Sequence, residues 1–245
     1  MSNKKISTNS LGPNKKRLLK DVVDIMKHPL TSEGINYFHD ESNFQKGYAF
    51  IFGPKDTLYE NGIYFFEFSF PNDYPFSPPK LKYLTNNGKT RFNPNLYRSG
   101  KVCISILNTW KGEQWTSCQT IRSILLTLLT LLHNKPLLNE PGITEKHRDF
   151  INYNKIIRYR NYETAIMRVA DRKLLPDPFV STFHIIKKHL INNKDQILKD
   201  IFEKIKTDDE KSVGEVVNCG IYKMSCRINY AKLYEKMKIV LSEYN

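Results

Sequence analysis

The sequence predicts an α+β fold in which an antiparallel meander lies between helices. Two runs of β-branched and aromatic residues, Tyr48–Phe52 and Ile63–Phe70, are bounded by turn residues, as the strands of a meander are. Apolar residues recur at helical spacing before these runs, over Asn14–His28, and again after them, over Ile121–His133. The order along the chain is therefore helix, meander, long loop, helices and a helical appendage.

The first half of the chain opens with a polar stretch, residues 1–13, which has no periodicity and predicts a disordered tail. The helix over Asn14–His28 presents a basic outer face, and Pro29 ends it. Asn61-Gly62 marks the turn between the two long strands. A short run at Leu81–Leu84 is the third or the fourth strand of the meander.

The second half begins with a long irregular stretch, Asn86–Ser117, which is rich in Gly, Asn and Pro. A loop of this length within a compact domain is usually functional. The apolar helix over Ile121–His133 follows and must be central in the core. Further helices are expected at about His147–Arg172, Phe183–Lys206 and Tyr230–Tyr244, the last two separated by a loop that contains Gly214 and Gly220.

The composition of the 245 residues allows a sizeable core, with 40% apolar and 26% charged residues. Lys and Arg number 38 against 25 Asp and Glu, a net charge of +13, which raises the expectation of nucleic acid, an acidic membrane surface or an acidic protein as a partner. No Arg-Gly repeat, aromatic RNA-binding pattern or Cys/His finger accompanies this charge. Nucleic acid is therefore an unlikely partner, and a generic solvated basic surface is the simpler interpretation.

Membrane and metal binding are not expected from the sequence. The longest apolar run, Ile121–Leu132, is shorter than the roughly 20 residues that span a bilayer, and the first twenty residues show no secretory signal. The four cysteines are scattered without a C-x-x-C pair, which argues against a zinc site or disulfide framework and for a reducing compartment: Cys103, Cys118, Cys219 and Cys226. We expect an intracellular, cytoplasmic or nuclear protein in which the last three cysteines are buried.

One cysteine has a setting that suggests chemistry. Cys103 lies in the loop-rich region, eight residues after the Asn95 of an Asn-Pro-Asn turn. A thiol that carries an acyl group must be exposed and partly ionised, and it needs a donor for the developing oxyanion, which the Asn95 amide could supply. No histidine is near in sequence, so a Cys-His hydrolase is disfavoured. The alternative is a buried structural cysteine between Val102 and Ile104.

The surrounding motifs resemble those of the ubiquitin-conjugating enzyme family. The pattern F-P-x-x-Y-P-x-x-P-P at Phe70–Pro79 follows the meander, and an N-P-N turn, the cysteine and a tryptophan come after it in the family order. The turn Gly53–Gly62 also matches the family's G-P-x-x-x-x-Y-x-x-G. The resemblance covers about residues 14–165 and implies a core domain with a four-stranded antiparallel meander, flanked by the amino-terminal helix and carboxyl-terminal helices. Residues 166–245 would form a helical extension.

The resemblance implies that Cys103 accepts the carboxyl terminus of ubiquitin, or of a ubiquitin-like protein, from an activating enzyme as a thioester. The modifier then passes to a substrate lysine or to a ligase. Asn95 matches the family asparagine that stabilises the oxyanion or orders the active-site loop, and the sequence leaves both roles open. No metal or bound cofactor is implied, because the activating enzyme consumes the ATP. The family default is a monomer.

The resemblance also implies two docking surfaces. The first helix would bind the acidic domain of the activating enzyme through its basic residues, with an ordinary solvated face as the alternative: Lys15, Lys16, Arg17 and Lys20. Ligases would bind the loop of Phe76, which could instead be a core residue, and a second loop at Ser117 and Cys118. Ser117 replaces the family proline, which puts ordinary RING-ligase binding in doubt.

Other departures concern the site itself. Asn93 replaces the family histidine of H-P-N, a chiefly structural residue, and Ser105 stands where common members have an aspartate. Before the next helix, Glu140 occupies the place of a family acid. A carboxylate there could orient an attacking lysine and accept its proton. An ordinary loop acid is the equally weighted alternative.

Within the family, the motifs resemble most those of the larger members, which have a carboxyl-terminal extension. One such member, in humans, receives its modifier from a second activating enzyme.

Two alternatives to a conjugating enzyme remain. A non-catalytic, ubiquitin-handling scaffold of the same fold is disfavoured because Cys103 and Asn95 are both retained. A nucleic-acid-binding protein rests on the net charge alone.

Overall fold

The computed structural model describes residues 13–207 and 214–244. The predicted tail at residues 1–12 lies outside this range, while Pro13 already belongs to helix α1, Pro13–Lys27. The helix predicted over Asn14–His28 is thereby confirmed. Leu18, Val22 and Ile25 bury its apolar face in the core.

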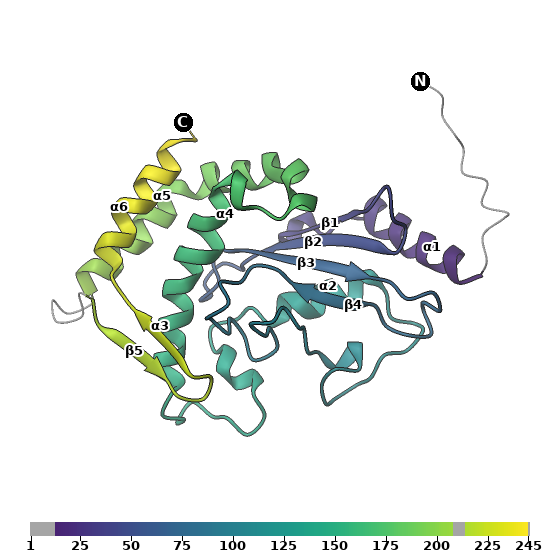
Figure 1. The fold of residues 1–245 in the computed structure, drawn as a ribbon, viewed down its shortest axis with the longest axis horizontal. Helices are drawn as coiled ribbons and strands as arrows, with labels where there is room; N and C mark the ends of the chain where they lie inside the picture. Colours follow the sequence, from purple (N-terminus) through teal and green to yellow (C-terminus); the bar gives the residue numbers. More distant parts are fainter. Residues whose placement is uncertain (1–12, 208–213, 245) are drawn as a thin grey trace.

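A four-stranded antiparallel sheet in the order β1-β2-β3-β4 forms the centre of the fold, as predicted (Figure 1). Its strands are β1 Ile35–His39, β2 Lys46–Phe52, β3 Ile63–Ser69 and β4 Lys80–Tyr83. The pairing register places Phe50 opposite Phe65 on one face and Ala49 opposite Phe66 on the other. Sequence reasoning assigned no residues to β1, which pairs with β2 from Ile35 opposite Ile51 to His39 opposite Gly47.

The β2–β3 turn requires glycine for a close backbone approach. The Gly53 amide donates to the Gly62 carbonyl at 2.7 Å, which closes the turn. A Cβ on Gly53 would lie 1.7 Å from the Tyr59 carbonyl oxygen, so no larger residue fits there. Tyr59 is fully buried, and its hydroxyl donates to the Phe92 carbonyl at 2.6 Å. The turn therefore supports the loop that leads to the cysteine.

The apolar helix α2, Ile121–Thr130, has its amino terminus capped by Thr120, which forms a reciprocal capping box with Ser123. Ile121, Ile124, Leu125 and Leu128 are buried, which confirms a central core helix. The long stretch before it contains one short 3₁₀ turn, Ser105–Leu107, among the described residues.

The next helical run is continuous across the predicted domain boundary at residue 165. It consists of α3, Phe150–Arg160, a π-helical stretch, Asn161–Met167, and α4, Arg168–Ala170. Asn161 is 2% exposed; its Oδ1 accepts from the Tyr64 hydroxyl at 2.5 Å, and its Nδ2 donates to the Glu60 carbonyl at 2.8 Å. These bonds attach the helical run to the sheet.

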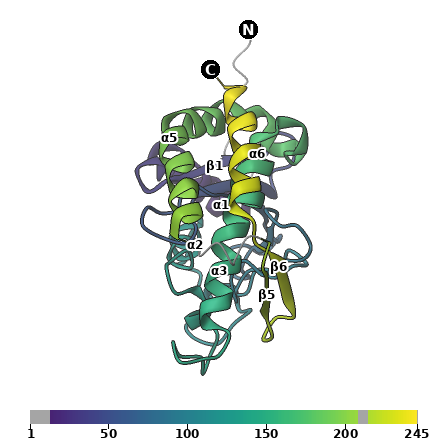
Figure 2. The same ribbon diagram turned by 90° about the vertical axis from the view of Figure 1, so that its left-hand side faces the viewer.

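The carboxyl-terminal part covers one face of the sheet. After a 3₁₀ segment, Asp177–Thr182, come the long helices α5, Phe183–Thr207, and α6, Tyr230–Ser242, which lie side by side (Figure 2). The Phe179 ring lies 4.3 Å from the Phe65 ring, and the His189 ring stacks on Phe52 at 3.8 Å. The extension and the core domain therefore share one hydrophobic core.

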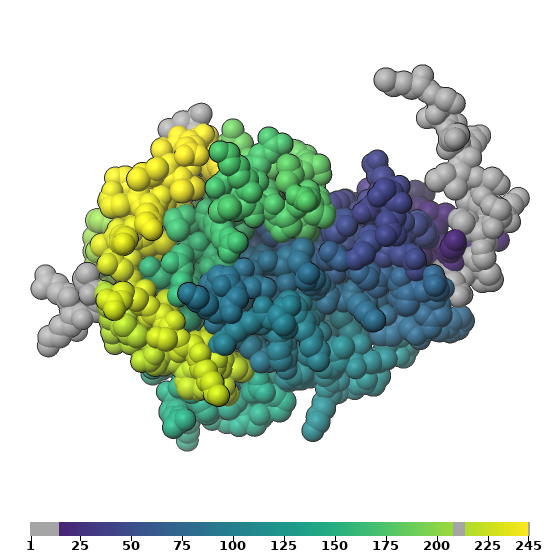
Figure 3. Space-filling view, viewed as in Figure 1, coloured from purple at the N-terminus to yellow at the C-terminus, as the bar shows by residue number. Residues whose placement is uncertain are grey.

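The prediction of a loop between α5 and α6 is wrong, because the chain forms a β-hairpin there. Its strands are β5, Val216–Cys219, and β6, Met224–Arg227. Alternate residues of both strands are buried, namely Val217, Cys219, Met224 and Cys226. Strands of four residues give too short an alternation to be recognised without their partner. The hairpin surface lies directly against the core domain, near the residues that surround Cys103 in sequence (Figure 3).

Candidate functional site

Cys103 and Asn95 face each other across a short hairpin in the long loop. The Cys103 amide donates to the Asn95 carbonyl at 2.9 Å, and Asn95 Nδ2 donates to the Cys103 carbonyl at 2.6 Å. Leu96 bridges Val102 in the next rung, and the Tyr97 amide donates to the Lys101 carbonyl at 2.9 Å. The two residues that the sequence singled out are thus held together by main-chain and side-chain hydrogen bonds.

Asn93 performs the structural task expected of the histidine that it replaces. It is fully buried, its Nδ2 donates to the Leu131 carbonyl at 2.8 Å, and its Oδ1 accepts from the Asn95 amide at 3.0 Å. These bonds join the end of the α2 segment to the turn that carries Asn95. The side-chain amide of Asn95 donates to the Cys103 carbonyl, a geometry that fits the loop-ordering role of Asn95.

The prediction that the Cys103 thiol is exposed is wrong for this conformation. The residue is 2% exposed, as a buried structural cysteine would be. The turn that follows it is tied to both of its neighbours, because Thr109 Oγ1 accepts from the Ile104 amide at 3.0 Å and contacts the Val102 carbonyl at 3.3 Å. Reaction at this thiol therefore requires a local movement.

Glu140, the candidate acid, is half-buried and belongs to the segment that contacts the turn of Asn95. Its neighbour Asn139 donates from Nδ2 to Asn93 Oδ1 at 3.3 Å, which connects the acid to the turn of Asn95. Glu140 Oε2 accepts from the Tyr222 hydroxyl at 2.5 Å. The hydroxyl comes from the tip of the β5–β6 hairpin, so the extension contributes directly to the surroundings of the acid.

Several contacts hold the hairpin tip in place. Asp149, which immediately precedes α3, is 7% exposed and accepts from the amides of Gly220 at 3.1 Å and Ile221 at 2.9 Å. Burial opposes ionisation of Asp149, but these two hydrogen bonds, together with the neighbouring Arg148 and His147, lower the pKa of the carboxyl. The Arg98 guanidinium donates to the Tyr222 carbonyl. Sequence reasoning missed Asp149 and Tyr222, since no local pattern connects either of them to partners that are 71 to 82 positions away.

The predicted docking residues lie on α1 and on two loops that contact each other. Phe76 is 73% exposed, so the core alternative is wrong for it. Trp115 Nε1 donates to the Pro75 carbonyl at 2.7 Å and thereby places the loop of Ser117 and Cys118 beside that of Phe76. Cys118 is exposed, which corrects the expectation that it is buried; Cys219 and Cys226 are buried as expected.

The basic residues of α1 divide into two groups. Lys15, Lys16 and Lys20 are exposed. Arg17 is committed to structure: its Nε pairs with Asp21 at 3.0 Å, and its two terminal nitrogens donate to the Ser117 and Gln119 carbonyls at 2.6 and 2.9 Å. The three lysines are therefore the part of this set that is available to a partner.

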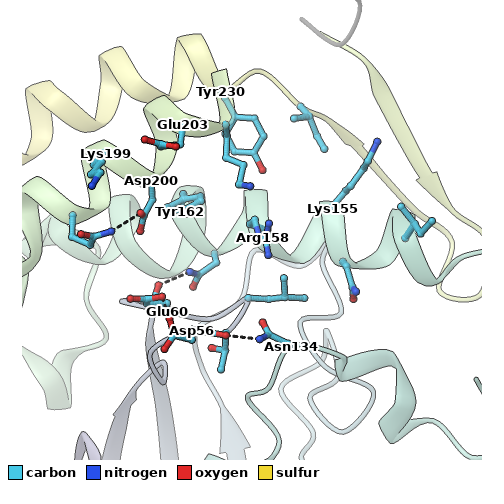
Figure 4. Close-up of a pocket in the computed structure, with 18 of the residues that line it drawn as sticks. Asp56, Glu60, Asn134, Lys155, Arg158, Tyr162, Lys199, Asp200, Glu203 and Tyr230 are labelled. Carbon is cyan, nitrogen blue, oxygen red and sulfur yellow. Dashed lines mark hydrogen bonds between the residues drawn. The ribbon is translucent and has the colours of Figure 1, made fainter. Parts of the chain in front are cut away.

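A surface hollow of about 910 Å³ lies between α3, α5 and α6. Figure 4 shows acidic side chains, among them Glu60 and Asp200, and basic ones, among them Lys155 and Arg158, on its walls. None of the residues predicted to be functional lines it. Its mixed charge selects no single class of ligand.

No group of three His, Cys, Asp or Glu side chains in the described ranges could hold a metal ion. Within the same ranges, no helix is long and apolar enough to cross a membrane.

Comparison with known proteins gives consistent matches. A family model described as "Ubiquitin-conjugating enzyme" matches residues 17–161. The human "Ubiquitin-conjugating enzyme E2 Z" is 40% identical over 166 residues, which are 66% of this chain and 46% of that protein. The human "Dual E2 ubiquitin-conjugating enzyme/E3 ubiquitin-protein ligase BIRC6" is 32% identical over 216 residues, 83% of this chain and 4% of that protein.

The chain spans about half the length of the E2 Z proteins that it matches, 50% in Xenopus tropicalis and 46% in humans. A solved structure, that of human "Ubiquitin-conjugating enzyme E2 G1", is 32% identical and covers 49% of this chain and 94% of that chain, with a TM-score of 0.44.

Proposed function

The chain belongs to the ubiquitin-conjugating enzyme family, and we propose that it carries ubiquitin or a ubiquitin-like modifier as a thioester on Cys103. The observation that carries the proposal is the pairing of Cys103 with Asn95 through two hydrogen bonds, inside the segment that the family model matches. Both bonds use the main chain of residue 103 and order the loop that presents the thiol, as a chain that carries a thioester there requires.

Two exchanges at one carbonyl make up the proposed reaction. The Cys103 thiolate attacks the thioester carbonyl that joins the modifier to a cysteine of the activating enzyme, and that cysteine leaves as a thiolate. In the second exchange a substrate amine or a ligase thiol attacks the same carbonyl, and Cys103 leaves. No metal or bound cofactor takes part, because the activating enzyme consumes the ATP.

Glu140 is proposed to act in the second exchange when the attacking group is a lysine. An amine with a pKa of about 10.4 in water must lose a proton to be nucleophilic, and a nearby carboxylate can orient the amine and take that proton. The hydrogen bond from Tyr222 supports this role by fixing the position of Glu140 Oε2. Tyr222 is accordingly a positioning residue.

Partner docking is proposed on α1 and on the two loops that the Trp115 hydrogen bond joins. Lys15, Lys16 and Lys20 are exposed and would meet an acidic surface of the activating enzyme, which would speed the encounter more than it deepens affinity. Phe76 is an exposed aromatic anchor for a ligase, beside the loop of Ser117 and Cys118.

The second candidate function, a non-catalytic ubiquitin-handling scaffold, is favoured by one observation, the 2% exposure of Cys103. The two candidate functions differ in whether the Cys103 thiol can be charged. Because charging requires the thiol to be accessible, we expect the turn over residues 105–109 to move when the activating enzyme binds.

The test is a charging assay with ubiquitin, ATP and each of two activating enzymes, analysed on a non-reducing gel. An adduct that thiol reagents remove, that Cys103→Ala abolishes and that Cys118→Ala leaves intact is expected. Cys118 is the matched control because its thiol is exposed and Cys103 is not. If neither ubiquitin nor a panel of ubiquitin-like modifiers charges the chain with either activating enzyme, the enzyme is refuted in favour of the scaffold.

A further inference from the structure

A notch lined by basic residues lies where the hairpin tip of the extension meets the hairpin that carries Cys103. It encloses about 320 Å³ and takes Arg91 and Arg98 from the core domain and Lys223 from the extension. The rings of Tyr97 and Tyr222 complete its aromatic walls. We call this site the seam notch, because neither part of the chain forms it alone.

The arginines of the seam notch lack a negative partner. In the ranges 13–207 and 214–244, neither Arg91 nor Arg98 has a carboxylate within ion-pair distance, although both are half-buried. Two acids contact the hairpin tip without pairing with these arginines: Glu140 accepts from the Tyr222 hydroxyl, and Asp149 accepts from the amides of Gly220 and Ile221. Taking a cation out of water without a counter-charge is costly, so the arrangement favours an anion from outside.

The donor groups are arranged for such an anion. The Arg91 guanidinium is held between the Tyr97 ring, at 3.4 Å from its centroid, and the Tyr222 ring, at 4.7 Å. Arg91 donates to the Pro94 carbonyl and Arg98 to the Tyr222 carbonyl, and the Nε atoms of both are buried without a partner among the described residues. The buried Nε atoms are out of reach of a ligand, so an anion in the notch would be bound by the remaining terminal N–H groups of each guanidinium, whose charge and planar shape suit a carboxylate.

The position of the notch relative to Cys103 suggests what the anion is. Arg98 lies three residues beyond Asn95, which faces Cys103, so it is about 10 Å along the hairpin from the reacting thiol at ~3.3 Å per residue. An extended peptide whose lysine lies at Cys103 spans that distance in about three residues.

We propose that the seam notch binds an acidic side chain located about three residues from the acceptor lysine of the protein being modified. This inference rests on the proposed function for its connection to a lysine. It assigns the extension a part in substrate selection, since Lys223 and Tyr222 both come from the hairpin tip.

The test measures binding and transfer separately. Binding is followed by fluorescence anisotropy with the full, uncharged chain and labelled extended peptides that carry one lysine and, three residues away, glutamate, glutamine or phosphoserine. The glutamate peptide is expected to bind about 5-fold or more tightly than the glutamine peptide at low salt, as one or two partly exposed charge contacts allow, and to lose this preference in high salt. Preference for phosphoserine alone would assign the notch to a phosphate.

The variants Lys223→Glu and Arg98→Gln should remove the preference. Arg227→Glu is the matched control, because it makes the same charge reversal on an exposed residue of the same hairpin outside the notch. Equal binding of all three peptides, or an equal loss with Arg227→Glu and Lys223→Glu, would overturn the proposal.

Transfer is followed as discharge of the preloaded chain to the same peptides, with free lysine as the reference acceptor. Faster discharge to the glutamate peptide than to the glutamine peptide is expected. A chain that charges but does not distinguish the peptides refutes the seam notch. A chain that binds the glutamate peptide selectively but cannot be charged refutes the proposed function instead.

Discussion

Asp149 holds the hairpin tip onto the core domain, and replacing it tests how the extension is anchored. Its carboxylate is 7% exposed and accepts from the amides of Gly220 at 3.1 Å and Ile221 at 2.9 Å. Hydrogen bonds to a charged group contribute about 1.5–3 kcal/mol each. In Asp149→Asn one neutral acceptor remains, worth about 0.5–1.5 kcal/mol, and the side-chain NH₂ faces the second amide.

Docking of the hairpin should therefore weaken by about 2–4 kcal/mol, which corresponds to roughly 30- to 1,000-fold more frequent local opening. The measurement is amide hydrogen exchange over residues 216–227, with the amides of β2 and β3 as the internal reference. Asp195→Asn, on the exposed face of α5, is the matched control. Faster exchange confined to the hairpin is expected. Exchange there that changes less than about 3-fold would refute the argument, because one charged hydrogen bond cannot be lost and the other weakened at so small a cost.

The same anchor depends on pH in a direction that follows from its pKa. The folded pKa of Asp149 is lowered, so its contribution is complete above the ordinary carboxyl value of about 3.9 and is lost as the pH falls through the lower folded value. The protection of the hairpin amides in the unmodified chain, with the pH dependence of intrinsic exchange divided out, should therefore stay high at pH 4 and fall in stronger acid. Asp149→Asn should show no such additional acid step.

Two further predictions concern the active-site loop and the extension. Asn95→Ala removes the 2.6 Å bond to the buried Cys103 carbonyl and should lower the free energy of unfolding by about 1–3 kcal/mol in urea titrations while slowing both charging and transfer; slower transfer with unchanged stability would indicate the oxyanion role instead. Burial lowers the pKa of His189 to about 4, so between about pH 6.5 and 4 the unfolded chain binds a proton that the folded chain does not, and stability should decline as the pH falls through that window. His189→Phe, which keeps the stacking on Phe52, should abolish this decline in urea titrations at pH 4 to 7; a pH-independent stability of the unmodified chain would contradict it.

The sequence by itself determined the features that rest on local patterns. The helix at the amino terminus, the strands at Tyr48–Phe52 and Ile63–Phe70, and the core helix from Ile121 are confirmed because their periodicity and turn residues are visible within one segment. Cys103 and Asn95 were found together because they belong to one hairpin, where eight residues of separation place them face to face.

Only the tertiary structure decided how distant segments meet. The short strands β5 and β6 have too few residues for a clear alternation, and packing against the core selects them. Tyr222 reaches Glu140, and Arg17 reaches Ser117, across more than 80 residues of chain. Such contacts depend on the packing of whole elements, and no local pattern encodes them.

The exposure of the cysteines shows the same division. Apolar neighbours are compatible with Cys103 either as a reactive thiol or as a buried structural cysteine. The sequence therefore could not decide that the residue is 2% exposed. Cys118 lies in a loop held out from the core by Trp115 and Arg17, and it is exposed although cysteine is usually buried. Burial is a property of the surfaces that assemble around a residue, and for that reason it was settled only by the fold.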